Sequence, residues 1–251
     1  MNMTGQVEGK IAIITGAASG MGAAVARLMY ANGANLVLAD LSDSVVQLAA
    51  ELGDRAVGIA GDVGASADAV AMVDLAVTRF GGADILCNIA GYPGDNRGTL
   101  VDCSDENFDK LVAVNFRGPF MTMKAAIPHM IARGGGSIVN VASTAALKGY
   151  PSLVVYGGSK AGLVALSRGA ATEFAAQNIR VNTICPGPHE TPMLLAAIEA
   201  NPASRETIIA NVPMRRLGKP EEIAQAIYFY ASDASAFVTG TVLPVEGGQT
   251  A

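Results

Sequence analysis

The sequence predicts an α/β fold in which helices cover both faces of a parallel, doubly wound sheet of seven strands. Short aliphatic runs alternate along the chain with stretches whose apolar residues recur at helical spacing. Glycine accounts for 29 of the 251 residues and clusters where the aliphatic runs begin or end. Strands that are apolar at nearly every position and separated by helices are typical of a sheet buried on both faces, with right-handed crossovers.

Each aliphatic run is assigned to a strand and each periodic stretch to a helix. The expected strands are Ile11–Thr15, Asn35–Ala39, Ala56–Ala60, Asp84–Cys87, Ser137–Val141, Ile179–Ile184 and Thr241–Pro244. The expected helices include Met21–Ala31, Asp105–Ala132 and Val155–Gln177. Because no linker or repeat interrupts the alternation, residues 1–251 are expected to form one domain, with an inserted lid of two short helices at about residues 188–213.

Charge and composition disfavour several classes of function. The net charge is −5 and no basic run occurs, so nucleic acid is not an expected partner. No window approaches the roughly 20 apolar residues of a membrane helix, and residues 1–10 lack a secretory signal, so a cytoplasmic location is expected. The three cysteines and two histidines support neither a disulfide framework nor a metal site. No GxSxG motif occurs, which disfavours a serine hydrolase.

A glycine-rich loop, TGAASGMG at residues 15–22, directly follows the first expected strand and opens a helix. Glycines at such a turn let the backbone approach a pyrophosphate, and the helix N-terminus offers free N–H groups to it. The expected contacts of a dinucleotide are Gly16, Ser19, Gly20, Met21 and Gly22. The alternative is a turn that binds no ligand. A P-loop is excluded, because no GxxxxGK(S/T) motif occurs.

Asp40 ends the second expected strand, 18 residues beyond Gly22, where a dinucleotide-binding fold places an acid on the adenine ribose. A carboxylate there accepts hydrogen bonds from both ribose hydroxyls and repels a 2′-phosphate. Ala18, Ser19 and Leu41 bring no cation to the site, so NAD is the expected cofactor. The alternative role for Asp40 is to cap the next helix, although Ser42 or Asp43 suits that role better.

Tyr156 and Lys160 lie four residues apart, which places them on one face of the predicted helix. Ser143 follows the fifth expected strand. The carboxyl end of that strand lies on the same sheet edge as Asp40, Asp62 and Asn88. As a pair alone, Tyr156 and Lys160 could simply be exposed. The convergence of these groups with a dinucleotide loop favours a catalytic site.

The motifs together give the chain a resemblance to the short-chain dehydrogenase/reductase family, in its branch of about 250 residues, with a Rossmann-like fold. The resemblance covers nearly the whole chain and rests on TGxxxGxG at 15–22, Gly61-Asp62-Val63, Asn88-Ile89-Ala90-Gly91, Asn115, Ser143, Tyr156-x-x-x-Lys160, Pro186-Gly187 and Thr191-Pro192-Met193. It implies that the cofactor also contacts Leu41, Asp62, Val63, Asn88, Ala90, Gly91, Tyr156, Lys160, Pro186, Gly187, His189 and Thr191.

Two positions depart from the usual family pattern. Ile89 replaces the second Asn of NNAG, and His189 stands where Ile or Val usually follows Pro-Gly-x. The family uses the backbone at that second position to hold the carboxamide of the cofactor, so His189 is compatible with binding. We expect the His189 side chain to face solvent at the hinge of the lid; its alternative is to project into the substrate site.

The implied catalytic set is Asn115, Ser143, Tyr156 and Lys160. Oxidation of an alcohol requires a base at the hydroxyl oxygen while hydride moves to the nicotinamide, and Tyr156 is the expected base. Ser143 holds the same oxygen. By resemblance, Lys160 bonds the nicotinamide ribose and Asn115 positions a water. We also expect the Lys160 charge to lower the pKa of Tyr156 from its ordinary value near 10.

The expected substrate is a small to medium, mostly apolar secondary alcohol or its ketone, because the segments around the cleft are rich in Leu, Val and Met. Lys148 or Arg97 would instead favour an anion. Two other functions stay open, a noncatalytic NAD-binding sensor and a dehydratase or epimerase on the same fold. A homotetramer is expected, because the helix Val155–Gln177 is apolar on more than one face and family members pair this helix across a twofold axis.

Overall fold

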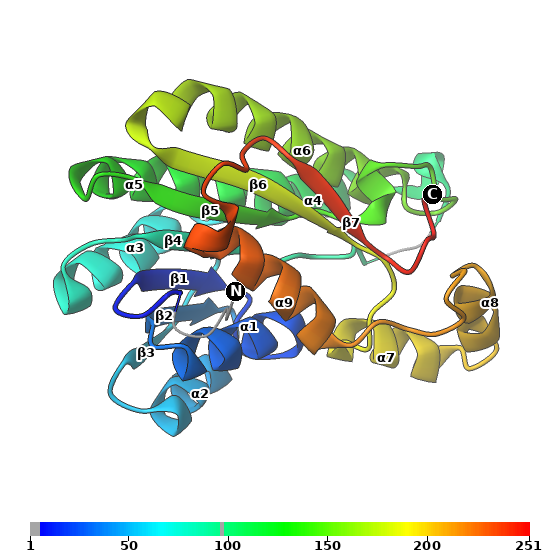
Figure 1. Cartoon of the computed structure of the whole chain (residues 1–251). Coiled ribbons are helices and arrows are strands. Elements are labelled where there is room, and N and C mark those ends of the chain that lie inside the picture. Colours follow the sequence, from blue (N-terminus) through cyan, green and yellow to red (C-terminus); the bar gives the residue numbers. More distant parts are fainter. Residues whose placement is uncertain (1–5, 96–97) are drawn as a thin grey trace.

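The computed structural model describes residues 6–95 and 98–251, and its centre is a seven-stranded sheet in the order β3-β2-β1-β4-β5-β6-β7 (Figure 1). Every neighbouring pair of strands is parallel. The strands are β1 Ile11–Thr15, β2 Asn35–Asp40, β3 Ala56–Ala60, β4 Ile85–Asn88, β5 Gly136–Val141, β6 Ile179–Pro186 and β7 Val242–Val245. The predicted fold class is confirmed, and each predicted strand lies within two residues of an observed one at either end.

Two layers of helices enclose the sheet (Figure 1). One face packs against α1 (Gly20–Ala31), α2 (Ser44–Leu52) and α9 (Pro220–Ala231), and the other against α3 (Ser66–Phe80), α5 (Gly118–Ala132) and α6 (Val154–Phe174). The side chains of β1 alternate between two cores: Ala12 and Ile14 lie with α1 and α9, while Ile11 and Ile13 lie with α3 and α5. Both faces are apolar because successive strand residues point to opposite sides.

The predicted single helix over 105–132 is wrong in its middle. The chain forms α4 (Asp105–Val112), a π-helical turn over Ala113–Arg117, and then α5. Pro119 has no N–H to offer the carbonyl of Asn115, so the regular α-helical bond cannot form there. The Asn115 side chain also bonds the main chain of Tyr92, accepting from its N–H and donating to its carbonyl oxygen, each at 2.8 Å.

Shorter helical elements complete the chain. The predicted helix Val155–Gln177 is α6 followed by a separate 3₁₀ turn, Ala175–Gln177. Other 3₁₀ turns lie at Leu100–Asp102, Thr144–Ala146 and Asp233–Ser235. The inserted segment contains two short helices, as expected: α7 (Pro192–Ala200) and α8 (Ser204–Ala210). No helix in the described parts of the chain is long and apolar enough to cross a membrane.

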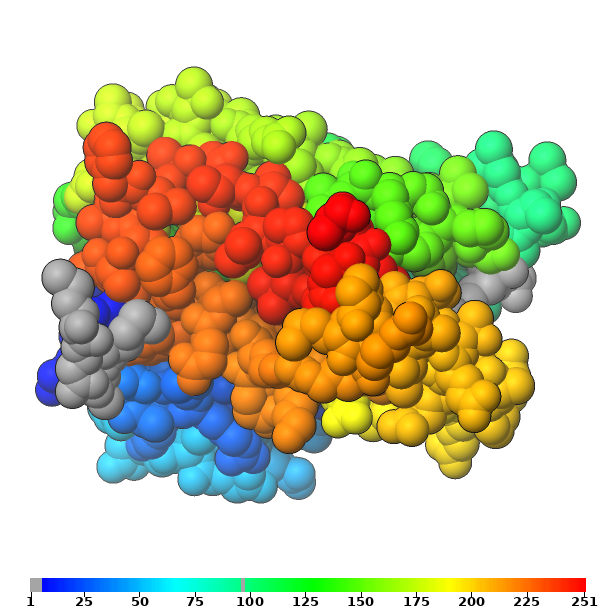
Figure 2. Space-filling view, turned by 45° about the vertical axis from the view of Figure 1, so that its right-hand side comes forward, coloured from blue at the N-terminus to red at the C-terminus, as the bar shows by residue number. Residues whose placement is uncertain are grey.

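The C-terminal residues lie between the inserted segment and the chain that follows β5 (Figure 2). Met214 N–H donates to the carbonyl oxygen of Gly247 at 3.1 Å. Lys148 Nζ donates to the carbonyl oxygen of Gln249 at 2.9 Å. Through the C-terminal residues, these bonds connect Met214, at the end of the inserted segment, with Lys148, five residues after Ser143.

Candidate active site

A cleft with an empty volume of about 1280 Å³ runs along the carboxyl ends of β1, β2, β3 and β4. The strand order reverses between β1 and β4, which is the point where doubly wound sheets bind ligands. Twelve of the predicted cofactor contacts line this cleft: Gly16, Ser19, Gly20, Met21, Gly22, Asp40, Leu41, Asp62, Val63, Ala90, Gly91 and Thr191. Segments that are far apart in the sequence, from Gly16 to Met193, therefore line one cleft.

The glycine loop is shaped by close backbone approaches. Gly16 has φ +67°, and a Cβ added there would lie 2.8 Å from the backbone of Ala90. A Cβ on Gly22 would lie within 2.0 Å of the Gly16 carbonyl oxygen. Ser19, the N-cap of α1, makes no side-chain capping bond, so the first turn of α1 keeps N–H groups for an anion. The loop thus fits the diphosphate of a dinucleotide.

Asp40 connects the glycine loop to the end of β2. Its Oδ2 accepts a 2.9 Å hydrogen bond from Ala18 N–H, and its Oδ1 accepts one of 3.0 Å from Ser42 N–H. The N-cap position of α2 belongs to Asp43, so Asp40 does not cap that helix. Its carboxylate lines the cleft, where it can accept bonds from ribose hydroxyls.

Eight further residues line the cleft and were not among the expected cofactor contacts: Gly61, Ile89, Tyr92, Lys110, Ala113, Val114, Pro192 and Met193. Several of them adjoin motifs that the sequence did reveal. Lys110 and Val114 share a helix face beside Asn115, a signal that helical spacing could have supplied. Lys110 is the one cationic side chain among the described residues that line the cleft.

Asn88, an expected cofactor contact, does not line the cleft, and its side chain is held in the interior. Asn88 Nδ2 donates to Asn140 Oδ1 at 2.8 Å, and Thr122 Oγ1 donates to Asn88 Oδ1 at 2.7 Å. The amide is 2% exposed and joins β4, β5 and α5. Strand β4 extends through Asn88, whereas the sequence predicted its end one residue earlier, and this keeps the side chain inside.

Lys160 and Asn115 meet beside Gly91. A Cβ on Gly91 would lie 3.4 Å from Lys160 Nζ and 3.5 Å from Asn115 Oδ1. Lys160 is 2% exposed, and its Nζ donates to the carbonyl oxygen of Val141 at 2.9 Å. Asn115 Nδ2 donates to Ser159 Oγ at 3.2 Å. Predicted residues from the chain after β4, from the π turn and from α6 thereby lie together at Gly91, which lines the cleft.

Ser143 and Tyr156 lie on the segments that flank this point. Ser143 stands two residues after β5, and its Oγ accepts a 3.1 Å hydrogen bond from Ala145 N–H. Tyr156 is in the first turn of α6, and its carbonyl oxygen accepts from Ser159 Oγ at 2.7 Å. Since Ser159 also bonds Asn115, one hydrogen-bonded chain connects the π turn to the backbone of Tyr156.

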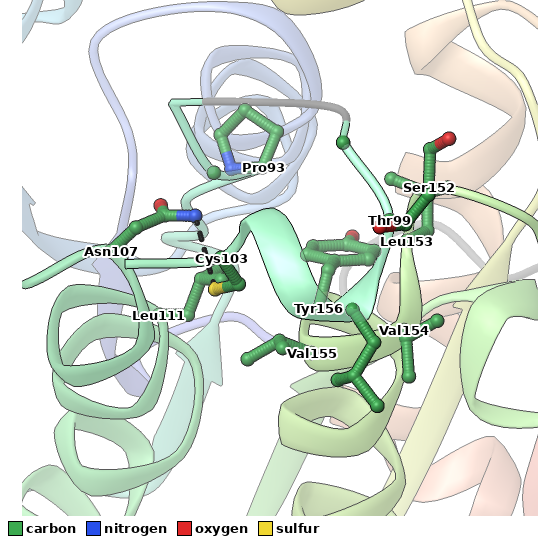
Figure 3. A pocket seen from close by; sticks show the side chains of 13 residues that line it. Pro93, Thr99, Cys103, Asn107, Leu111, Ser152, Leu153, Val154, Val155 and Tyr156 are labelled. Atoms are coloured by element: carbon green, nitrogen blue, oxygen red, sulfur yellow. Dashed lines mark hydrogen bonds between the residues drawn. The ribbon is translucent and has the colours of Figure 1, made fainter. Parts of the chain in front are cut away.

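A second, smaller pocket of about 360 Å³ adjoins Tyr156 (Figure 3). Its walls come from the chain after β4 and from residues before and within α6: Pro93, Gly94, Gly98, Thr99, Leu100, Cys103, Asn107, Leu111, Ser152, Leu153, Val154, Val155 and Tyr156. Apolar side chains make up much of this wall, and the Tyr156 ring lies among them. Arg97, the sequence-derived candidate for binding an anion, lies outside the described residues.

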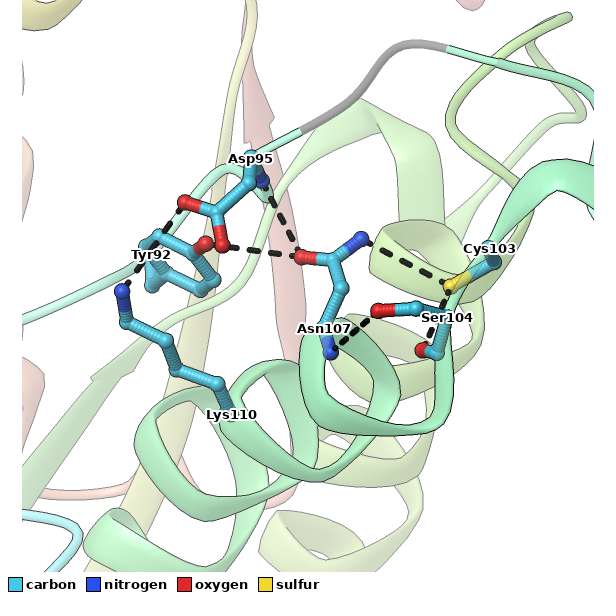
Figure 4. Close-up of polar contacts among 6 residues, drawn as sticks. All are labelled: Tyr92, Asp95, Cys103, Ser104, Asn107 and Lys110. Atoms are coloured by element: carbon cyan, nitrogen blue, oxygen red, sulfur yellow. Dashed lines mark hydrogen bonds and ion pairs between the residues drawn. The ribbon is translucent and has the colours of Figure 1, made fainter.

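A polar cluster that the sequence did not reveal shapes the chain after β4 (Figure 4). Asn107 Oδ1 accepts from Asp95 N–H at 3.0 Å and from the Tyr92 hydroxyl at 3.4 Å. Lys110 Nζ lies 4.2 Å from the centre of the Tyr92 ring and 3.8 Å from Asp95 Oδ1. Desolvation, followed by the effect of Asp95, raises the pKa of Tyr92 to about 12, so Tyr92 stays protonated and does not compete with Tyr156 as a base.

Burial sets the protonation of the other titratable groups near the site. It lowers the pKa of Lys160 to about 8, and it raises the pKa of the Cys185 thiol to about 11 and of the Cys87 thiol to about 12. The two thiols are therefore protonated at neutral pH and are not nucleophiles. Among the described residues, no group of three His, Cys, Asp or Glu side chains could hold a metal ion.

His189 does not face solvent, which corrects the sequence-based expectation. Its side chain is buried, with 5% exposure, and Nδ1 lies 3.0 Å from the carbonyl oxygen of Gly187. The ring packs against Gly218, which the inserted segment brings back from 29 residues away. Pro186 belongs to β6, and Gly187 N–H donates to the carbonyl oxygen of Val245 at 3.1 Å. These two residues and His189 do not line the cleft, although they were expected to contact the cofactor.

A glycine loop at the switch point of a doubly wound sheet, next to a Tyr-x-x-x-Lys helix, defines the class of Rossmann-like oxidoreductases that use a dinucleotide. A family model described as enoyl-(acyl carrier protein) reductase matches residues 16–250. The chain belongs to the short-chain dehydrogenase/reductase family, as its motifs predicted, and is an oxidoreductase of that family.

Relatives and solved structures cover nearly the full chain. An uncharacterized oxidoreductase of Thermotoga maritima is 41% identical over 97% of this chain and 98% of its own. A cis-4-hydroxycyclohexanecarboxylate dehydrogenase of Sinomonas cyclohexanicum is 39% identical over 96% of this chain and 97% of its own. A crystal structure of a 3-ketoacyl-(acyl-carrier-protein) reductase from Brucella melitensis complexed with NADH has a TM-score of 0.90 and 35% identity, covering 98% of this chain and 100% of that one.

Proposed function

We propose that this protein is an NAD(H)-dependent oxidoreductase that interconverts a secondary alcohol and its ketone. The observation that carries the proposal is the meeting of Lys160 Nζ and Asn115 Oδ1 beside Gly91, at the inner end of a cleft that begins in a glycine loop. Tyr156 and Ser143 lie on the two segments next to it. On this proposal, Tyr156 is the proton acceptor, Ser143 the hydroxyl donor and Lys160 the buried cation of one site.

The proposed roles follow from the chemistry of each side chain. The cofactor, when bound, accepts or delivers the hydride. Tyr156 removes the hydroxyl proton during oxidation and returns it during reduction. Ser143 donates a hydrogen bond to the same substrate oxygen as charge develops on it. Lys160 provides a positive charge next to the phenolate and bonds the nicotinamide ribose, and Asn115 keeps the proton path open toward solvent.

We propose NAD rather than NADP on the strength of Asp40. Its carboxylate lines the cleft at the end of β2, and none of the adjacent residues Ala18, Ser19 and Leu41 is a cation. A 2′-phosphate in that position would face the carboxylate at short range. The similar Brucella melitensis structure is of a complex with NADH, which supports the choice.

We propose a mostly apolar substrate of small to medium size. Exposed apolar side chains gather on the segments expected to surround it: Leu147, Val154, Met193 and Leu195. Lys148, considered as a contact for an anion, donates instead to Gln249 and lies 5.1 Å from the Tyr150 ring centre. The similarity to a cis-4-hydroxycyclohexanecarboxylate dehydrogenase favours a cyclic alcohol among the candidates, and the name of that relative also includes a carboxylate.

We also propose that the chain is a single domain with residues 188–213 as the lid, that it forms a homotetramer, and that it is located in the cytoplasm. Phe108 on α4 is 49% exposed and Phe120 on α5 is 42% exposed, which supports burial of these helices against a second copy. Phe237 is fully exposed beside β7 and marks a second contact. Light scattering that gives the monomer mass of 25.5 kDa would reject the tetramer.

The experiment for the proposed function is a panel of secondary alcohols and ketones assayed by NADH absorbance. Turnover of cyclic or branched apolar members, faster with NAD(H) than with NADP(H), is the expected result. A noncatalytic sensor would bind NADH and turn over no member of the panel. A dehydratase or epimerase would be indicated by cofactor that remains bound through purification and by product formation without a net change in NADH.

A further inference from the structure

The two ends of the inserted segment are joined at its base. Gly218 N–H donates to the carbonyl oxygen of Pro188 at 3.0 Å, and Glu190 N–H donates to the carbonyl oxygen of Gly218 at 2.8 Å. This short parallel pairing closes a loop that contains α7 and α8. The position of both helices relative to the sheet therefore depends on how residues 188–190 and 218 are held.

His189 occupies the centre of that pairing, and its side chain contacts both ends. Nδ1 lies 3.0 Å from the Gly187 carbonyl oxygen, a distance at which the ring N–H donates when the proton is on Nδ1. On the opposite side, a Cβ on Gly218 would lie 2.4 Å from Cδ2 and Nε2 of the ring. The imidazole therefore fills the space that a side chain at residue 218 would need.

The backbone transmits this contact to the cofactor cleft. The carbonyl oxygen of His189 accepts a 2.7 Å bond from Thr191 N–H. Thr191 lines the cleft, and its Oγ1 accepts from Leu194 N–H at 3.4 Å at the start of α7. Displacement of the ring would move Gly187 on one side and Thr191 on the other.

We infer that His189 is a positioning residue, whose imidazole holds the turn 187–191 against Gly218 and thereby sets the affinity for the nicotinamide cofactor and the position of the lid. The inference rests on the proposed function. An aliphatic residue, which the family usually has at this position, fills the space but cannot donate to the Gly187 carbonyl oxygen. This chain thus adds a polar bond at the turn, and acid would place a charge on the packed ring that makes it.

The charged groups around His189 come from three other elements. Glu222 of α9 pairs with Arg216 through bonds of 2.6 and 2.7 Å, and Glu246 follows β7. Glu190 is the next residue along the chain. Burial lowers the pKa of His189 in spite of the acidic Glu222, so acid converts a neutral packed ring into a buried cation.

The first test measures the Kd for NADH by fluorescence for wild type, His189→Val, His189→Ala, Gly218→Ala and the double variant His189→Ala/Gly218→Ala. Gly218 does not have a positive φ, so an alanine there meets the ring without backbone strain. Each single variant is expected to weaken NADH binding by about fivefold or more, with kcat at saturating cofactor changed less than about twofold. In the double variant the methyl group takes the vacated space, and binding is expected to recover relative to Gly218→Ala.

The second arm follows NADH affinity from pH 7.5, through the ordinary histidine pKa of 6.5, down to the lowest pH at which wild type stays folded. The wild-type affinity should fall as His189 becomes protonated, and His189→Val should remove that fall. His129→Asn, which changes the other histidine of the chain, is the matched control and should behave as wild type. Melting temperatures check that each variant is folded at the assay temperature. Valine is chosen at residue 189 because it fills part of the space of the ring and so helps the variant to fold.

The outcomes separate this inference from the proposed function. Wild type that fails to bind NADH would overturn both. Wild type that binds NADH, with His189→Val equal to it in affinity and in pH dependence, would overturn the inference alone. Strict additivity of the Gly218→Ala and His189→Ala effects would also overturn it, because ring and glycine would then act independently.

Discussion

Lys160 Nζ donates a 2.9 Å hydrogen bond to the carbonyl oxygen of Val141, which ties the helix carrying Tyr156 to the strand preceding Ser143. The ammonium is buried and has no carboxylate partner among the described salt bridges. Such a charge destabilises the fold, so its presence in the interior points to a function. The bond to Val141 thus holds a buried positive charge on the same helix as Tyr156.

Lys160→Met is expected to raise the free energy of unfolding at pH 7. Burial lowers the pKa of Lys160 to about 8 from its ordinary value of 10.5. A lysine with a lowered folded-state pKa costs stability below that pKa, and the cost fades as pH rises toward the unfolded value. The full cost is about 3 kcal/mol, from which loss of the Val141 bond subtracts about 1–2 kcal/mol.

The measurement is urea unfolding of wild type and Lys160→Met between pH 7 and 10. Wild type should gain stability relative to the variant as pH rises from 8 toward 10.5. The comparison cancels other groups that titrate in the same range. A difference between the two proteins that does not depend on pH would show that Lys160 is not a buried cation.

Asp40→Ala should reduce or reverse the preference for NAD over NADP. At roughly 5 Å and an effective dielectric of about 20, a carboxylate repels a phosphate charge by about 3 kcal/mol. Wild type is therefore expected to favour NAD by at least about tenfold in kcat/KM. Asp40→Asn is the matched variant, because the amide oxygen can still accept the bond from Ala18 while the charge is gone. Equal kcat/KM for both cofactors in wild type would reject this account of Asp40.

Gly22→Ala should destabilise the fold and abolish NADH binding. Its Cβ would come within 2.0 Å of the Gly16 carbonyl oxygen, so the loop must open, at an expected cost of more than about 2 kcal/mol. Gly158→Ala in α6 is the control, since nothing lies within 4 Å of its added Cβ. A helical glycine replaced by alanine should gain about 0.5–1 kcal/mol. Thermal melts and NADH titration compare the two; normal binding by Gly22→Ala would exclude the loop as the diphosphate site.

The alternation of aliphatic and helical segments was sufficient to predict the sheet, because buried parallel strands leave a strong local signal at runs such as Ile11–Thr15. The glycine loop and Asp40 were found for a related reason, since a turn without side chains and an acid at a strand end both depend on local spacing. These residues line one cleft in the structure.

Other features depend on partners distant in sequence, and local patterns did not reveal them. The π turn at Asn115 follows from bonds to Tyr92 and from Pro119, four residues on. His189 is buried because Gly218 returns to it across the whole inserted segment. Asn107 accepts hydrogen bonds from Tyr92 and Asp95, and these residues are separated from it by intervals that match no helix or strand period. Each of these contacts forms only once the chain has folded.

The central claim is that Tyr156 is the general acid/base, and Tyr156→Phe tests it most directly. The variant loses the proton acceptor and keeps the ring, so NADH binding measured by fluorescence should stay within about twofold of wild type, while kcat on the best substrate should fall by at least about 100-fold. A Tyr156→Phe protein that retains more than about 5% of the wild-type kcat would contradict the mechanism, because removal of a general base should lower kcat by a larger factor.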